Sequence, residues 1–126
     1  MKSILEGRPI RVFNHGNMQR DFTYIDDIIN AVLLVLAKPS SATVPHRVYN
    51  IGHSSPVQLM DFIKVIEEVT EHRAIMKMEE MQPGDVTCTY ADITHLQHDF
   101  GFVPRVSIQQ GIHSFYKWYQ EYAHLF

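Results

Sequence analysis

Apolar residues recur at intervals of three and four positions along much of the chain, which is the spacing of one buried helix face. The most regular stretch begins at Ile25, has two aspartates in its first turn and ends before Pro39. A second helix is predicted over about 56–70, where residues 54–56 supply a capping hydroxyl and a first-turn proline. The apolar stripes of the two helices are Ile25, Ile28, Ile29, Val32, Leu33 and Leu36 in the first, and Leu59, Phe62, Ile63, Ile66 and Val69 in the second.

Three shorter helices complete the helical pattern. Residues 2–6 are predicted to form the end of a helix that stops at Gly7, and we expect that element to start upstream in its natural context. Asp92 is expected to cap a short helix that ends near Gly101, and Ser107 is expected to cap a last helix. Their apolar positions are Ile93, Leu96 and Phe100 in the former, and Ile108, Ile112, Phe115, Tyr119 and Tyr122 in the latter.

Short runs of β-branched and aromatic residues lie between these helices. They predict strands at 10–13, 47–51 and 74–78, and strand-like backbone at 22–24. The chain has no internal repeat, no low-complexity tract and no linker-like segment. We therefore expect a single mixed α/β unit over residues 1–126.

The composition of the chain argues against some classes of function. The net charge of -3 argues against a nucleic-acid partner. Residues 1–20 nevertheless hold four cations and a single acid, which favours a small anionic ligand. Cys88 is the only cysteine, so the sequence favours a reducing cytoplasm. The longest apolar run, at 31–37, is too short to span a membrane, and we see no secretory signal.

Two polar segments stand out as candidates for ligand binding. Arg20 opens the run RDFTYIDDI, and its planar guanidinium suits phosphate oxygens. Asp85 follows a Pro-Gly turn, where a carboxylate could accept bonds from a sugar diol. The simpler alternatives are an ion pair between Arg20 and one of the aspartates at 21, 26 and 27, and a role for Asp85 in capping local backbone amides.

Taken as a series, these segments resemble a known family. The runs RDFTYIDDI from Arg20, VYNIG from Val48, QPGDVTCTYADITHL from Gln82 and GFVPRVSIQQGI from Gly101 occur in this order. The series resembles the C-terminal, substrate-binding portion of the extended short-chain dehydrogenase/reductases. Within them the chain is most similar to the NAD-dependent epimerase/dehydratase family, above all to bacterial UDP-glucuronate 4-epimerases.

The resemblance implies a role for five positions. Arg20 matches an arginine that contacts the nucleotide diphosphate, and Asp85 matches a carboxylate near the UDP ribose. Val12 and Phe13 match the strand whose backbone contacts the uracil. Gln82 stands where many relatives have a second phosphate-binding arginine, so this chain offers one cation fewer. Residues 22–52 would dock, as a helix and a strand, on a dinucleotide-binding sheet that the chain lacks.

The catalytic and cofactor groups of the family are absent from the sequence. The family uses NAD and a tyrosine whose pKa is lowered by a lysine four residues later. No tyrosine here is followed by lysine at that spacing, and no two glycines are close enough to form the phosphate-binding loop. We therefore expect no catalytic residue, no bound NAD and no turnover from this chain alone, and only weak binding of a UDP-sugar.

Several alternatives remain at this point. The chain could be a non-catalytic UDP-sugar-binding module, a structural remnant, or part of a related nucleotide-sugar dehydratase or decarboxylase. His95, His98 and Cys88 lack any established metal-site spacing, so no metal site is expected. Because the helix from Ile25 is apolar around more than half its circumference, we also expect self-association through surfaces left by the missing sheet.

Overall fold

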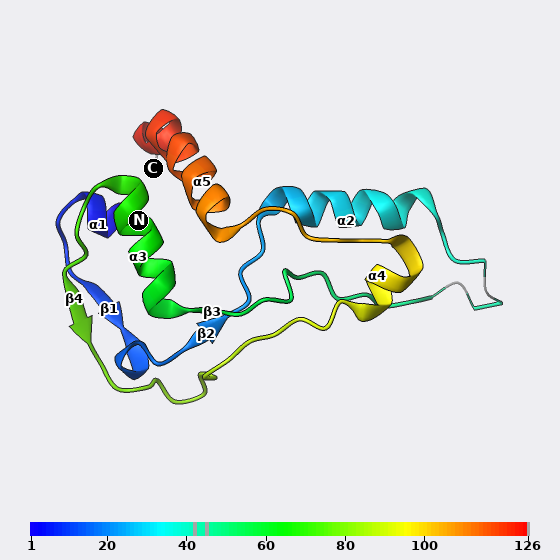
Figure 1. Ribbon diagram of the computed structural model, residues 1–126, viewed down its shortest axis with the longest axis horizontal. Helices are drawn as coiled ribbons and strands as arrows, with labels where there is room; N and C mark the ends of the chain where they lie inside the picture. The colour runs from blue at the N-terminus through cyan, green and yellow to red at the C-terminus, as the bar shows by residue number, and fades with distance from the viewer. Residues whose placement is uncertain (42, 45, 126) are drawn as a thin grey trace.

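The computed structural model describes residues 1–41, 43–44 and 46–125, and its elements follow the order shown in Figure 1. The α-helices are α1 (Lys2–Leu5), α2 (Ile25–Ala37), α3 (Leu59–Thr70), α4 (Thr94–Phe100) and α5 (Ile108–Tyr122). The strands are β1 (Ile10–Val12), β2 (Gln19–Arg20), β3 (Val57–Gln58) and β4 (Met76–Met78). Two 3-10 turns, η1 (Phe13–Gly16) and η2 (Ala123–Leu125), complete the set.

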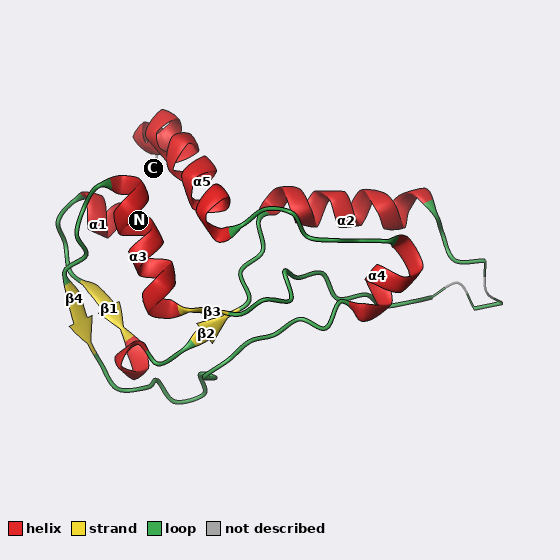
Figure 2. Cartoon of the chain, in the orientation of Figure 1, coloured by secondary structure: helices red, strands yellow, loops and turns green. Residues whose placement is uncertain are grey.

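The elements gather at two ends of an elongated molecule. One end holds α1, α3, α5 and the parallel pair β1–β4, and the other holds α2 and α4 (Figure 1). Figure 2 shows that the segments running between the two ends are mostly loops. Near the middle, β2 pairs with β3 in antiparallel fashion. The fold is the expected mixture of helices and short strands, and no helix in the described part of the chain is both long and apolar enough to cross a membrane.

Local capping signals predicted several helix ends correctly. The Ser107 hydroxyl accepts the Gln110 N–H at 3.3 Å while the Gln110 side chain accepts the Ser107 N–H at 3.0 Å, which completes a capping box at α5. At α4 the N-cap is Ile93, one residue after the predicted Asp92, whose carboxylate accepts the Thr94 N–H at 2.9 Å. That helix ends at Gly101, whose φ of 66° is the left-handed conformation that glycine adopts without strain.

Two local predictions were wrong. Helix α3 begins at Leu59 rather than 56, because Val57 and Gln58 pair with β2. The predicted serine cap at residues 54–55 is absent, because the N-cap of α3 is Gln58, and the Ser54 hydroxyl lies 3.0 Å from the Tyr90 hydroxyl. Of the predicted strand-like segment at 22–24, Tyr24 has extended backbone, although the ladder of β2 ends at Arg20. Each error reflects a pairing partner that is distant in sequence.

The predicted strand at 47–51 is also wrong, because no described segment pairs with it. It is held by side chains instead. The Tyr49 hydroxyl donates to Asp99 at 2.7 Å, and Arg47 forms an ion pair with the same carboxylate at 3.1 Å. Hydrogen bonds with His98 and Tyr49 hold the pKa of the Asp99 carboxyl below its usual value. The segment thus lies against α4 without joining a sheet.

Helix α2 buries one side only. Ala31 packs with residues of α4 and the loop after it, forming a core of Ala31, Ile93, Leu96 and Phe102 with Val35, Tyr49, Ile51, Ala91 and Phe100 around it. The opposite side of the helix is solvent-exposed, with relative exposures between 47% and 74% for Ile25, Ile29, Val32, Leu33 and Leu36. The predicted apolar stripe is therefore real, but within this chain it is largely uncovered.

Asp27 joins the first turn of α2 to the segment before α5. It is 1% exposed, and its two carboxylate oxygens accept the N–H groups of Arg105 and Val106, each at 3.0 Å. Charge-assisted bonds of this kind are stronger than neutral ones. Asp27 therefore fixes where the chain enters α5 relative to α2.

We expect Asp27→Ala to lower the free energy of unfolding by roughly 2–4 kcal/mol, because it leaves two backbone N–H groups without their acceptor. Asp26→Asn is the matched control: it changes the exposed aspartate of the same helical turn and should cost no more than about 1 kcal/mol. Urea denaturation followed by circular dichroism measures both. Equal losses for the two variants would show that Asp27 acts only through the helix dipole.

Candidate nucleotide-binding site

Strand β2 brings together the two polar segments predicted from the sequence. On one side it pairs with β3, and on the other Gln19 bonds to a loop. The Gln19 N–H donates to the Thr87 carbonyl at 2.8 Å, and the Thr89 N–H donates to the Gln19 carbonyl at 3.2 Å. Because the loop at 87–89 continues the turn at 82–86, that turn lies next to Arg20.

Arg20 and Asp85 form an ion pair, although they are 65 residues apart in sequence. Arg20 Nη2 donates to Asp85 Oδ1 at 2.8 Å, and Nη1 donates to the Gln19 carbonyl at 2.8 Å. Their side chains are 24% and 32% exposed, so both are held in place yet open to a ligand. The expected alternative in which Arg20 pairs with a neighbouring aspartate is wrong, because its carboxylate partner is Asp85.

The turn that presents Asp85 is defined by local bonds. The Asp85 N–H donates to the Gln82 carbonyl at 3.1 Å, and Gly84 adopts a φ of 84°, a conformation suited to glycine. Asp85 Oδ1 also accepts the Val86 N–H at 2.9 Å, so the predicted capping role of this carboxylate is confirmed. The Gln82 side chain is exposed in the same turn.

Asp21, the residue after Arg20, ties the site to the rest of the chain. Its Oδ2 accepts the N–H groups of Ser54 and Ala91, both at 3.0 Å, and its Oδ1 accepts that of Ser55 at 3.4 Å. Gly52 is required beside it, because a methyl group at this position would collide with the Ala91 side chain. Sequence reasoning treated Asp21 only as a possible partner of Arg20 and missed this role.

Val12 ends strand β1, which pairs with β4, and Phe13 begins the 3-10 turn η1 instead of continuing the predicted strand. Val12 is 1% exposed, and its carbonyl accepts the Glu79 N–H at 2.9 Å. The Arg11 guanidinium lies 4.6 Å from the centre of the Phe13 ring, a cation–π distance. Arg11 also bonds to the Glu79 carboxylate and holds its pKa below the usual value. The structure thus joins Arg20, Asp85 and Gln82 in one place, with Val12 and Phe13 on a neighbouring element of the chain.

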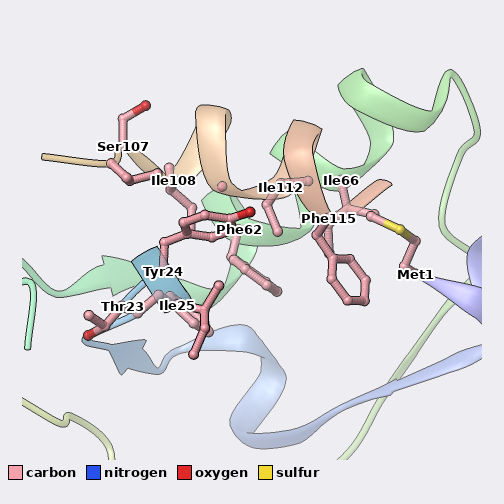
Figure 3. A pocket seen from close by; sticks show the side chains of 13 residues that line it. Met1, Thr23, Tyr24, Ile25, Phe62, Ile66, Ser107, Ile108, Ile112 and Phe115 are labelled. Carbon is pink, nitrogen blue, oxygen red and sulfur yellow. The ribbon is translucent and has the colours of Figure 1, made fainter. Parts of the chain in front are cut away.

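An apolar cavity of about 420 Å³ lies beside the segment that follows Arg20 (Figure 3). It is lined by Phe62 and Ile66 of α3, by Ile112 and Phe115 of α5, and by residues 22–25. The Phe22 and Phe62 rings stack at 4.1 Å. The facing stripes of α3 and α5 were visible in the sequence, but nothing there showed that they leave a cavity. Its apolar walls do not match a nucleotide diphosphate.

The histidine and cysteine residues considered from the sequence as metal ligands are not arranged as a metal site. His98 lies 2.8 Å from the Asp99 carboxylate, and the Cys88 thiol is exposed near Gln19. Within the residues that the structure describes, no three histidine, cysteine or carboxylate side chains are arranged to hold a metal ion.

Comparison with known proteins identifies relatives that are similar to this chain in sequence. The NAD dependent epimerase/dehydratase family matches residues 1–52. Protein CapI of Staphylococcus aureus is 42% identical over 135 residues, which cover 96% of this chain and 40% of that protein. A protein of Rhizobium meliloti named "Probable UDP-glucuronate 4-epimerase" is 37% identical, over 94% of this chain and 39% of its own.

Solved structures agree with these relatives. The UDP-glucuronic acid 4-epimerase of Bacillus cereus, in complex with UDP-glucuronic acid and NAD, superposes with a TM-score of 0.84 at 29% identity. The match covers 95% of this chain and 38% of that one. UDP-glucose 4-epimerase of Thermotoga maritima, with UDP-glucose, gives a TM-score of 0.82 at 25% identity, over 97% and 38% of the two chains. The chain thus spans about two fifths of the length of the relatives it matches.

We expect Asp21→Asn to loosen the loops around the site. The amide keeps one acceptor oxygen and places a donor against backbone donors, so the amide protons of Ser54 and Ala91 should exchange at least ~10-fold faster. Hydrogen exchange by NMR measures this, with Asp61→Asn in the exposed first turn of α3 as the control. Unchanged exchange at both amides would contradict the role given to Asp21.

Proposed function

The chain belongs to the NAD-dependent epimerase/dehydratase family, and from this membership we propose that it is the nucleotide-sugar-binding part of a UDP-sugar epimerase. The parent reaction we propose is the C4 epimerisation of UDP-glucuronate to UDP-galacturonate. The names of the Rhizobium and Bacillus relatives support this choice. Because the chain spans only about two fifths of their length, the proposal for the chain itself is ligand binding.

The pairing of Arg20 with Asp85 carries the proposal. Arg20 is anchored at Nη1 and Nη2 by the Gln19 carbonyl and Asp85, so its planar cation has a defined orientation. A guanidinium fixed in this way, and partly exposed, is suited to phosphate oxygens of a diphosphate. This is the role that we assign to it.

Asp85 is suited to the sugar side of the same ligand. Both Arg20 Nη2 and the Val86 N–H bond to its Oδ1. Its other oxygen, Oδ2, receives no hydrogen bond from the described residues and is the acceptor that we assign to a ribose hydroxyl. Gln82 in the same turn adds a neutral amide, while Val12 and Phe13 are proposed to contact the uracil through the backbone.

The residues of this chain do not fit NAD. A dinucleotide needs closely spaced glycines between a strand and a helix, at the edge of a parallel sheet. Here the glycines are scattered over separate elements, and the parallel sheet of the described chain contains only β1 and β4. The Bacillus structure contains NAD, but none of the described residues of this chain forms a seat for the cofactor, so we derive no hydride-transfer step for it.

The proposal predicts that the purified chain, mixed with UDP-glucuronate and NAD, forms no C4 epimer. The physical reason is the lack of a tyrosine–lysine pair and of a cofactor site. Chromatographic separation of the two UDP-sugars measures the product, with an intact relative as the positive control. Turnover that disappears on mutation of a residue in this chain would overturn the prediction.

A second prediction concerns the ligand. UDP should bind with a dissociation constant on the order of millimolar, because an open surface gives few contacts and little desolvation. Arg20→Ala should weaken binding by roughly 10-fold or more, the scale of a charge-assisted bond. Arg8→Ala is the matched control, since Arg8 is an exposed arginine paired with Glu6 away from the site.

NMR chemical-shift titration is suited to affinities in this range. If UDP binds and both arginine variants lose affinity equally, the attraction is a general effect of positive charge. If UDP does not bind at all, the chain is a structural remnant of the family without its ligand.

A further inference from the structure

Glu79, the residue that follows β4, contacts the chain on both sides of Phe13. Its N–H donates to the Val12 carbonyl at 2.9 Å, and its carbonyl accepts the His15 N–H at 3.2 Å. Its carboxylate oxygen Oε2 lies 2.7 Å from Nε and 2.6 Å from Nη2 of Arg11. Three groups of one residue thus hold the chain before and after Phe13.

The Arg11 side chain also covers the Phe13 ring. Its guanidinium lies 4.6 Å from the ring centre, a cation–π distance, while two of its nitrogens bond to Oε2 of Glu79. The other carboxylate oxygen, Oε1, lies 3.3 Å from Nζ of Lys77, the residue opposite Arg11 in the β1–β4 ladder. Both oxygens of Glu79 are therefore engaged, and the Arg11 guanidinium has a defined position over the ring.

The turn after Phe13 depends on the same contacts. Asn14 and His15 have φ angles of 47° and 49°, in the left-handed region that residues other than glycine rarely adopt. Such residues cost free energy and persist only where surrounding contacts fix them. The His15 N–H bond to Glu79 and the Asn14 Nδ2 bond to the Asn17 carbonyl, at 2.8 Å, are contacts of this kind. The Phe13 backbone thus lies between a short strand and a strained turn.

The N–H of Phe13 faces away from β4. In β1 the Ile10 N–H donates to the residue before β4, and the Val12 carbonyl accepts from the residue after it. Because backbone groups alternate in direction along a strand, the Phe13 N–H points to the opposite edge. An N–H donor there matches the O4 acceptor of uracil, whereas cytosine carries an amino donor at the same position.

We propose that Arg11 and Glu79 are positioning residues for the base: together they fix the Phe13 backbone so that the site prefers uracil to cytosine. This inference rests on the proposed function, in which the backbone of Val12 and Phe13 contacts the uracil. It adds two side chains that act on the ligand through Phe13 rather than by touching it.

A simpler role for Glu79 is to neutralise Arg11 and Lys77, two cations that lie side by side in the ladder. That role alone would affect stability and the charge of the surface, but not the choice between bases. The Arg11 side chain is 61% exposed, and ion pairs in such positions contribute little to stability. The two roles therefore predict different results when base preference is measured.

NMR titrations of the purified chain with UDP and CDP test the proposal, because the two ligands share charge, ribose and diphosphate and differ only in the base. The unaltered chain should bind UDP about 3-fold or more tightly than CDP, the scale of one neutral hydrogen bond. Arg11→Met and Glu79→Gln should each make the two dissociation constants equal. The first variant removes a positive charge and the second a negative one, so a general charge effect would change UDP affinity in opposite directions.

Two further variants are controls. Arg11→Lys can keep a cation near both the Phe13 ring and Glu79, and it should retain most of the preference for UDP. Arg8→Met removes an exposed arginine that pairs with Glu6, and it should leave the preference unchanged. The amide spectrum of each variant shows whether the fold is intact.

Several results would overturn the proposal. A preference for UDP that survives both Arg11→Met and Glu79→Gln would leave the proposed function intact and remove the positioning role. Loss of the folded spectrum in both variants would show that the pair serves the fold itself. Equal binding of UDP and CDP by the unaltered chain would contradict base selection here while leaving the phosphate role of Arg20 in place. Absence of any UDP binding would overturn this inference and the proposed function together.

Discussion

Carboxylates that accept backbone N–H groups hold this chain in shape. Its sheets are pairs of strands two or three residues long, so ladder hydrogen bonds alone join few segments. Asp21 instead joins β2 to residues 54–55 and 91, and Asp27 joins α2 to residues 105–106. Charge-assisted bonds are about twice as strong as neutral ones, and each aspartate bonds to more than one amide. Two side chains thereby fix loops that a larger sheet would otherwise order.

The candidate site also depends on the hydrogen bonds of Asp21. Arg20 adjoins Asp21, and the turn that carries Asp85 is continuous with the loop that Asp21 anchors at Ala91. The ion pair between Arg20 and Asp85 is partly exposed, and pairs of this kind contribute only about 0–1 kcal/mol to stability. The fold therefore does not rely on the pair, and its two side chains can exchange partners with a ligand at little cost.

The sequence predicted features that depend on neighbouring residues and missed features that depend on residues distant in the chain. The Ser107 cap, the helix end near Gly101 and the turn before Asp85 are each specified by a few neighbouring residues, and the structure has all three. The failures, at 47–51 and at the start of α3, concern backbone whose state depends on a strand partner. Such a partner leaves no mark in the segment itself, because Val, Tyr and Ile favour a strand whether or not one is present.

In the candidate site, too, the contacts between distant residues could not be predicted from local sequence. That Arg20 and Asp85 belong to one site rested on the resemblance to a family, because nothing local connects residues 65 apart. The structure supplies the contact between them and adds Asp21, whose role needs three distant amides to be visible. The ligand roles of Val12, Phe13 and Gln82 still rest on the resemblance.

Helix α2 has one side that is fixed in the core and one side that is exposed. Its inner side packs in the core through Ala31 and is bonded to the segment before α5 through Asp27, so the helix cannot turn to bury its outer side without breaking both contacts. Contact of these exposed apolar side chains with water is unfavourable in free energy. Any partner that binds only the folded state stabilises it by mass action. A second molecule that covers this side would therefore raise the free energy of unfolding as its concentration rises.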